Sequence, residues 1–156
     1  MCSSDLHFEF PATDKRPAVT MTWYDGGKRP PAELFEGKGP AESGSLLVGE
    51  KGKLYSPGDY GTDRVLRGGA QDTEVSFPES PGHFEEWVRA IKGGESAMSN
   101  FPDYAGPLTE TILLGNLAVW ADGKKIEWDA KNLKATNAPE VDPIIRPKYR
   151  HGYSLR

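Results

Sequence analysis

Residues 80–129 decide the fold, and they read SPGHFEEWVRAIKGGESAMSNFPDYAGPLTETILLGNLAVWADGKKIEWD. Ser80 suits a helix N-cap and Pro81 the first helical position, where the missing N–H costs nothing. Gly93 supplies a left-handed end for this helix. Between them, four apolar residues with helical spacing predict one buried stripe: Phe84, Trp87, Val88 and Ile91.

A second helix is expected to begin at Gly106 and Pro107 and to run to about Trp120. Glu110 in its first turn suits the positive end of the helix dipole. After a polar loop, residues 125–129 alternate as a strand, with Ile126 and Trp128 on one side. We expect this strand and the helix stripes to form the core, the second helix contributing Leu108, Thr111, Ile112, Gly115 and Val119.

The first half of the chain predicts β-hairpins. Two runs alternate apolar and polar residues around a turn-rich segment at 11–17, namely Leu6, Phe8 and Phe10, then Val19, Met21 and Trp23. Residues 44–55 predict a second hairpin, because two short apolar strands flank a tight turn bordered by glycines. Residues 28–42 and 56–73 are expected to be irregular, and the chain after Ala130 reads as a polar, proline-broken tail.

Strands first, then a helix pair and then another strand are typical of an α+β fold. We therefore expect a mostly antiparallel open sheet with helices packed on one face. The 156 residues fit one domain, since domains commonly contain about 100–200 residues.

Composition excludes several classes of function. The net charge is −4, and no clustered Lys/Arg footprint of the kind that nucleic acid requires is present. No apolar run reaches the roughly 20 residues that span a bilayer. The single cysteine, Cys2, cannot form an internal disulfide, and no multi-cysteine metal site is possible. A short basic cluster, residues 146–151, reads as a solvated tail.

Candidate ligand-binding residues lie at the two expected helix starts. His83 falls in a first turn, where a neutral imidazole can hydrogen-bond a substrate hydroxyl, although a surface or capping role is the simpler interpretation. Asn100, Asp103 and Tyr104 precede the second helix, where short polar side chains and free N–H groups can grip a polyol or carboxylate. The alternative interpretation of these residues is that they cap the helix or, for the aromatic ring, pack against the core.

Weaker candidates lie in the first half of the chain. Trp23 and Tyr24 can stack on a sugar ring, but strand aromatics are more often core. Asp59-Tyr60-Gly61 is the weakest candidate contact. No glycine-rich Gly-x-Gly-x-x-Gly turn opens a helix, so the chain is not expected to bind a dinucleotide by itself.

Several segments, in this order and spacing, resemble the end of the Gfo/Idh/MocA oxidoreductases, the relatives of glucose–fructose oxidoreductase and inositol dehydrogenase. They are VTMTWYDGG at 19–27, the hairpin at 44–55, HFEEWVRAIKGG at 83–94, DYAGPLTE at 103–110 and GKKIEWD at 123–129. The family's catalytic Lys, in a Glu-Lys-Pro segment, has no match, nor has its His-x-x-x-Asp segment. Glu50-Lys51-Gly52 lies in a hairpin turn and has glycine in place of proline.

The resemblance implies that residues 1–156 form a C-terminal α/β substrate and oligomerisation domain of an NAD(P)-dependent sugar or polyol dehydrogenase, not catalytic alone. NAD or NADP would bind a Rossmann domain absent from this chain, and no cofactor would bind here. Implied partners are that Rossmann domain, further copies through the sheet face, and a sugar or polyol. A non-enzymatic carbohydrate-binding or self-association module is the alternative. A cytoplasmic location is favoured, with an export signal on a preceding segment left open.

Overall fold

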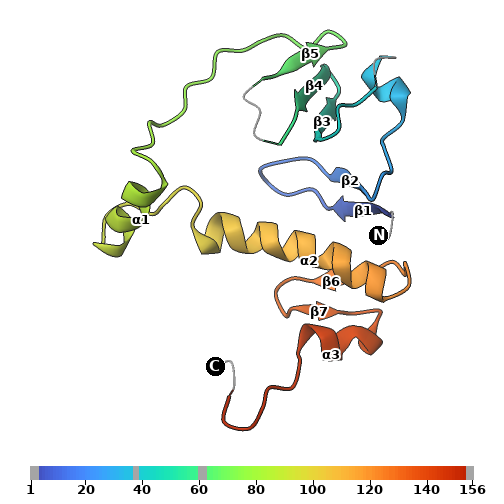
Figure 1. Ribbon diagram of the computed structural model, residues 1–156, viewed down its shortest axis with the longest axis vertical. Helices are drawn as coiled ribbons and strands as arrows, with labels where there is room; N and C mark the ends of the chain where they lie inside the picture. Colours follow the sequence, from blue (N-terminus) through green and yellow to red (C-terminus); the bar gives the residue numbers. More distant parts are fainter. Residues whose placement is uncertain (1–3, 37–38, 60–62, 154–156) are drawn as a thin grey trace. The chain divides into compact units, whose positions relative to one another are not determined.

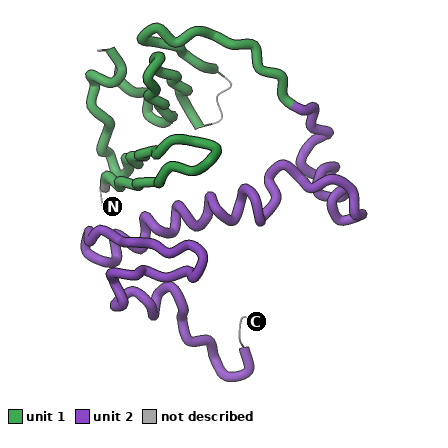
Figure 2. The backbone as a smooth tube through the Cα atoms, turned by 180° about the vertical axis from the view of Figure 1, so that it is seen from behind, with its two compact units in different colours: residues 1–77 green, residues 78–156 purple. Residues whose placement is uncertain are grey.

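A computed structural model describes residues 4–36, 39–59 and 63–153 (Figure 1). The chain divides into two compact units, Met1–Phe77 and Pro78–Arg156 (Figure 2). Each unit has its own antiparallel strands. Within the described residues, no helix is both long and apolar enough to cross a membrane.

The first unit opens with the expected hairpin, β1 (Ser4–Phe10) and β2 (Val19–Asp25). Its antiparallel register brings the apolar side chains of the two strands opposite one another in three pairs: Leu6 with Trp23, Phe8 with Met21, and Phe10 with Val19. Because side chains alternate along a strand, all six lie on one face. This face is only partly covered, since Trp23 is 52% exposed.

The second hairpin is also confirmed, with β3 (Gly44–Gly49) and β4 (Gly52–Pro57) joined by a two-residue turn. Gly52 has a φ of 138°, and a Cβ there would lie 2.4 Å from the backbone nitrogen of Ala70, so only glycine fits. The segments expected to be irregular contain two elements. They are the 3₁₀ helix η1 (Ala32–Phe35) and a third strand, β5 (Val65–Arg67), which pairs with β4.

A small core forms where η1 meets this three-stranded sheet. The ring of Phe35, which is buried, lies edge-on to Tyr55 with ring centroids 5.1 Å apart. Lys53 Nζ donates to the Leu34 carbonyl at 2.9 Å, and Arg67 Nη1 donates to the Phe35 carbonyl at 2.9 Å. These two bonds satisfy carbonyls at the end of η1 and attach it to the sheet.

The second unit contains both expected helices, α1 (His83–Ile91) and α2 (Gly106–Trp120), with a π-helical turn, η2 (Phe101–Ala105), leading into α2. The bounds of α2 match the prediction. Helix α1 begins two residues later than predicted, because Gly82, with a φ of 104°, occupies the N-cap position in place of Ser80. Gly93 has a φ of 82° just beyond α1, as expected.

The segment after Ala130 was predicted to be a polar tail, and this prediction is wrong. It contains β7 (Lys134–Ala135), the 3₁₀ helix η3 (Pro139–Val141) and the short helix α3 (Asp142–Ile145). Strand β6 (Trp128–Asp129) pairs with β7. Ala135, Ala138 and Val141 are buried with Leu117 of α2 and form an apolar core cluster in this unit.

The buried side of α2 also differs from the prediction. Gly115 is buried as expected, but the buried large side chain is Leu117, with Leu114 and Ala121 packed against the cluster. Leu108, Ile112 and Val119, which were expected to be core, are exposed. Ile126 and Trp128 pack against the cluster as expected. The predicted stripe of α1 is exposed as well, so it does not form core.

The α+β fold class is confirmed, since helices combine with antiparallel sheets. The described strands form three small sheets, of two, three and two strands. In the second unit, α2 packs over the β6–β7 hairpin through the Leu117 cluster (Figure 1).

Candidate functional site

The four residues predicted to bind a ligand all lie in residues 80–105, a segment that we call the clasp. It consists of the turn before α1, α1 itself, the loop after it and η2. Glu86 joins the turn before α1 to the loop after α1. One of its carboxylate oxygens accepts a hydrogen bond from the Ser80 hydroxyl, and the other accepts from the Met98 N–H at 2.9 Å.

Glu86 is the one charged residue with a buried side chain among the described residues, at 6% exposed. The hydrogen bond from the Ser80 hydroxyl and that from the Met98 N–H hold the pKa of this carboxyl below its usual value, with smaller contributions from Arg89 and His83. The side chain is therefore ionised at neutral pH. It satisfies two donors within the clasp, so its role is structural.

The loop between α1 and η2 is shaped by glycine. The Gly94 N–H donates to the Arg89 carbonyl at 3.0 Å, and a Cβ on Gly94 would lie 2.8 Å from Arg89 Cγ. An ion pair of 3.6 Å between Arg89 and Glu95 spans the same turn. Because this turn is tight, the chain reverses at once and returns past Glu86.

Asn100 caps η2. Its Oδ1 accepts from the Asp103 N–H at 2.8 Å, and its Nδ2 donates to the Ala97 carbonyl at 3.1 Å. Its backbone carbonyl accepts from the N–H groups of Tyr104 and Ala105. The capping interpretation is thus the one that the geometry supports for Asn100, because both ends of its side chain already have partners.

The other three candidates have side chains directed to solvent. His83 is the first residue of α1, and Asp103 and Tyr104 lie in η2; all three are exposed. The structure brings Asn100, Asp103 and Tyr104 into one turn, and Glu86 joins that turn to the helix that carries His83. Within the described residues, no hydrogen bond links His83 to the other three.

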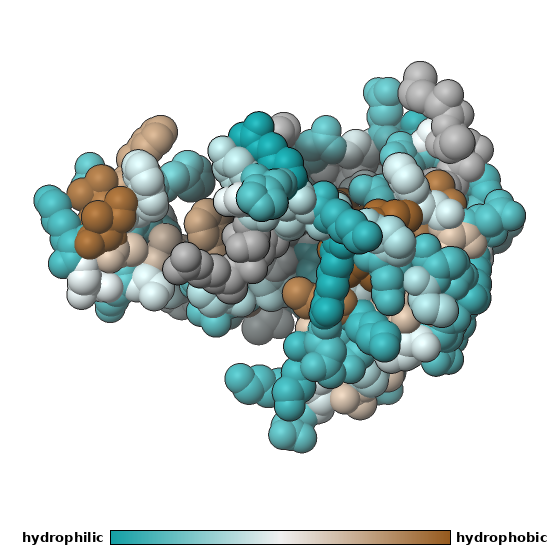
Figure 3. Space-filling view, turned by 90° about the horizontal axis from the view of Figure 1, so that it is seen from below, coloured by the Kyte–Doolittle hydropathy of each residue, from teal (hydrophilic) through white to brown (hydrophobic). Residues whose placement is uncertain are grey.

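The outer surface of the clasp is rich in aromatic residues. The exposed fractions are 80% for Phe84, 62% for Trp87 and 82% for Phe101, and Tyr104 and Ile91 are more than half exposed. Apolar side chains reach the surface in groups on the face drawn in Figure 3. Rings of this kind, beside the carboxylate of Asp103 and the imidazole of His83, can contact the C–H face of a polyol while polar groups bond its hydroxyls.

Sequence reasoning missed Glu86. It lies on the side of α1 away from the apolar stripe, where a charged residue is expected to face water. The available signal was Ser80, a hydroxyl residue just before the helix that can bond a carboxylate in its first turns. Met98, the second partner, is distant in sequence and left no local signal.

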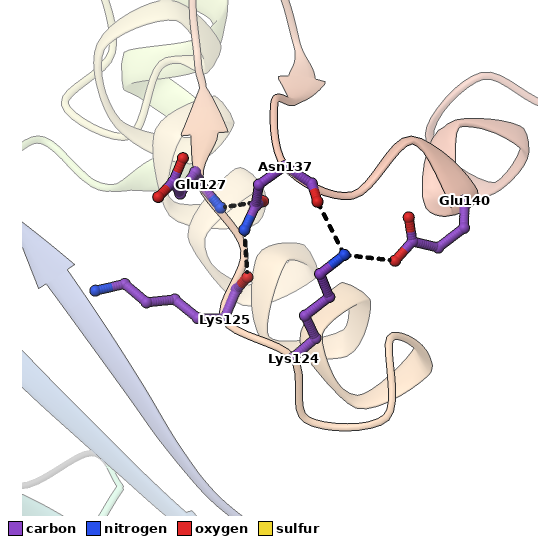
Figure 4. A network of polar contacts seen from close by, with 5 residues as sticks. All are labelled: Lys124, Lys125, Glu127, Asn137 and Glu140. Atoms are coloured by element: carbon purple, nitrogen blue, oxygen red, sulfur yellow. Dashed lines mark hydrogen bonds and ion pairs between the residues drawn. The ribbon is translucent and has the colours of Figure 1, made fainter.

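A second polar network lies beside the β6–β7 hairpin (Figure 4). Asn137 accepts from the Glu127 N–H and donates to the Lys125 carbonyl, both at 2.8 Å. Lys124 Nζ donates to the Asn137 carbonyl and to Glu140, and this contact lowers the pKa of Glu140. The network joins the segment before β6 to the segment after β7 at an exposed edge of the unit.

Side chains that could ligate a metal do not cluster in the described residues. No group of three His, Cys, Asp or Glu side chains that could hold a metal occurs among them. Cys2, Tyr60 and Gly61 lie outside the described residues. No protein-family model, curated protein or solved structure matches the chain.

Proposed function

We propose that this chain is the C-terminal substrate-binding and oligomerisation part of an NAD(P)-dependent sugar or polyol dehydrogenase of the Gfo/Idh/MocA type, not catalytic by itself. The sequence resemblance supports this proposal. The observation that carries it in the structure is the amount of surface that the chain leaves uncovered.

The accessible surface of the chain is 13192 Å². A compact monomer of 17.1 kDa exposes about 7,800 Å², and two separate compact units of half that mass expose about 9,400 Å² together. The chain therefore exposes roughly 3,800 Å² more than its two units require even when they are counted apart. Large obligate interfaces bury about 2,000–5,000 Å² counted over both partners, or roughly 1,000–2,500 Å² on each, so the excess on this chain is more than enough for such an interface.

The apolar side of helix α2 supports this proposal. Glu110 is its single charged residue, and its Oε1 accepts from Trp128 Nε1 at 2.6 Å. The outward side carries five large apolar side chains and no charge: Leu108, Ile112, Leu113, Val119 and Trp120. A helix that is apolar on all sides is typical of the interior of a larger protein.

The proposal assigns NAD(P) to the Rossmann domain and not to this chain. A dinucleotide site needs a glycine-rich turn between a strand and a helix, where the backbone N–H groups meet the pyrophosphate. Gly26 and Gly27 follow β2, but the next helical element, η1, begins only at Ala32 and has four residues. The turn after β2 therefore lacks the strand–turn–helix arrangement of a dinucleotide site, which supports this part of the proposal.

Within the proposal, the clasp contributes to the substrate site. Its exposed rings would contact the sugar or polyol, and His83 and Asp103 would bond hydroxyls. Asn100 would act indirectly, because its cap fixes the turn that carries Asp103 and Tyr104. Hydride transfer and the catalytic base belong to the other part of the enzyme.

Titration of the full chain with myo-inositol and D-glucose, followed by ¹H–¹⁵N NMR, tests this role. We expect millimolar binding with shifts confined to residues 80–105, and we expect Trp87→Ala to abolish them. Trp23→Ala is the matched control, because Trp23 is similarly exposed but lies in β2. Shifts centred on Trp23 would move the site to the first hairpin. Detection of NADH or NADPH binding to this chain by calorimetry would contradict the assignment of the cofactor to the Rossmann domain.

The same uncovered surface favours a second candidate, a non-enzymatic module that self-associates or binds carbohydrate. Analytical ultracentrifugation distinguishes the two versions of this candidate. A strict monomer at high concentration contradicts the self-association version. The carbohydrate version predicts that the chain binds a polyol and that its affinity does not increase when an NAD(P)-binding partner is present.

A further inference from the structure

The basic cluster near the end of the chain borders an open depression of about 670 Å³ in the second unit. Its lining combines apolar, aromatic and cationic side chains, chiefly Leu133, Ile145, Arg146, Lys148, Tyr149 and Tyr153. The volume falls in the range of about 300–1,000 Å³ that is usual for small-molecule sites. The proposed function does not use this region.

One wall of the depression is attached to the core. Ile145 packs against the Leu117 cluster, and Arg146 Nη2 donates to the Asn132 carbonyl at 2.6 Å. This bond joins the chain after α3 to the turn between β6 and β7. Arg146 is therefore held in place by the protein itself, and the apolar wall behind it is fixed by the same elements.

Two cations at the other side lack acidic partners within the described part of the chain: Lys148 lines the depression, and Arg150 lies next to it, over the ring of a lining tyrosine. Arg150 lies over the ring of Tyr153, with 4.1 Å between the guanidinium carbon and the ring centroid. Among the described residues, neither Lys148 nor Arg150 forms an ion pair. Both cations therefore keep their full capacity for an anion.

The segment that borders the depression is positively charged, whereas the rest of the chain is negatively charged. Residues 143–153 contain three cations, Arg146, Lys148 and Arg150, and no Asp or Glu, whereas the whole chain has a net charge of −4, so the remaining residues carry −7. Asp142 is the nearest acid in sequence and borders an adjoining depression shared with Arg146 and Lys148. It reduces the local charge to +2, which still favours an anion.

We propose that this depression binds a small anion with a planar apolar body, of the aromatic phosphate class. The apolar wall and the tyrosine rings would contact the planar body. Lys148 and Arg150 would contact the phosphate, for which a guanidinium offers paired donors and an ammonium a point charge. This inference is independent of the proposed function.

Calorimetric titration of the full chain with phenyl phosphate tests the inference, with phenol and inorganic phosphate as partial ligands. We expect saturable binding of phenyl phosphate that is at least tenfold tighter than that of either partial ligand. The double variant Lys148→Gln/Arg150→Gln should weaken it at least tenfold, and raising the salt concentration should weaken it further. Arg146 is left intact because it also holds the backbone of Asn132.

The matched control is Lys15→Gln/Lys51→Gln, which removes the same charge from two exposed turns of the first unit. Binding within twofold of the wild type is expected for this control, and an equal loss in both double variants overturns the proposal. Tyr153→Ala should weaken phenyl phosphate at least fivefold and leave phosphate unchanged. Absent or unsaturable binding, or phosphate binding as tightly as phenyl phosphate, also overturns it. Unchanged amide spectra for residues 106–141 verify that each variant is folded.

Discussion

Replacing Leu117 with alanine tests which side of α2 is buried. Leu117 is 6% exposed and packs with Ala135, Ala138 and Val141. The substitution loses about 2.4 kcal/mol of transfer free energy, from roughly 0.8 kcal/mol for each buried carbon group removed, and the remaining cavity adds to this. We therefore expect a loss of about 3 kcal/mol in the free energy of unfolding of the second unit.

Ile112→Ala is the matched control on the same helix. Ile112 is 51% exposed, so the substitution loses only about half of the transfer free energy of a fully buried side chain. The better helix propensity of alanine reduces this loss by roughly 0.4 kcal/mol. The expected loss is below about 1 kcal/mol. Hydrogen exchange of the α2 amides gives the opening free energy of this unit separately from the first. An equal or greater loss from Ile112→Ala would refute the assignment of the buried side.

The sequence predicted those elements whose position depends on residues within the element or directly beside it. The hairpin β1–β2 follows from strict alternation on both sides of a turn-rich segment, and the observed register pairs its apolar residues. The bounds of α2 follow from Gly106 and Pro107 at its start and from the polar residues after Trp120. In each case the deciding residues lie within the element or beside it.

The buried side of α2 was not predictable from its own sequence. Its residues are apolar almost all round, so no single periodic stripe distinguishes one side from another. The choice is made by Ala135, Ala138 and Val141, which come from a segment that reads as polar. Two of these are alanines, whose small side chains leave little hydropathy signal although both are fully buried.

The helix starts that carry the candidate residues were predicted from local pattern, but the contacts of these residues were predicted only in part. Asn100 and Asp103 were selected as polar residues before a helix, and the same spacing suits a cap, which is what Asn100 forms. Glu86 escaped prediction because the Met98 N–H, its second partner, approaches only after the loop has reversed. Contacts of this kind depend on the path of the chain and leave no periodic pattern in it.

Two further predictions test side-chain hydrogen bonds in the second unit. The pKa of Glu86 is lowered in the folded chain, so its contribution is complete above its usual value near 4.5 and is lost as the pH falls through the folded pKa. The protection factor of the Met98 amide should therefore fall below pH 4.5, and Glu86→Gln should remove this pH dependence. Trp128→Phe removes the indole donor to Glu110, which lies at 2.6 Å, and should cost about 1.5 kcal/mol because the acceptor is charged. Trp120→Phe should change the same opening free energy by less than about 0.5 kcal/mol, since Trp120 is 73% exposed and its indole has no partner among the described residues. Equal losses of stability for the two tryptophan variants in hydrogen exchange would contradict the expected contribution of the bond to Glu110.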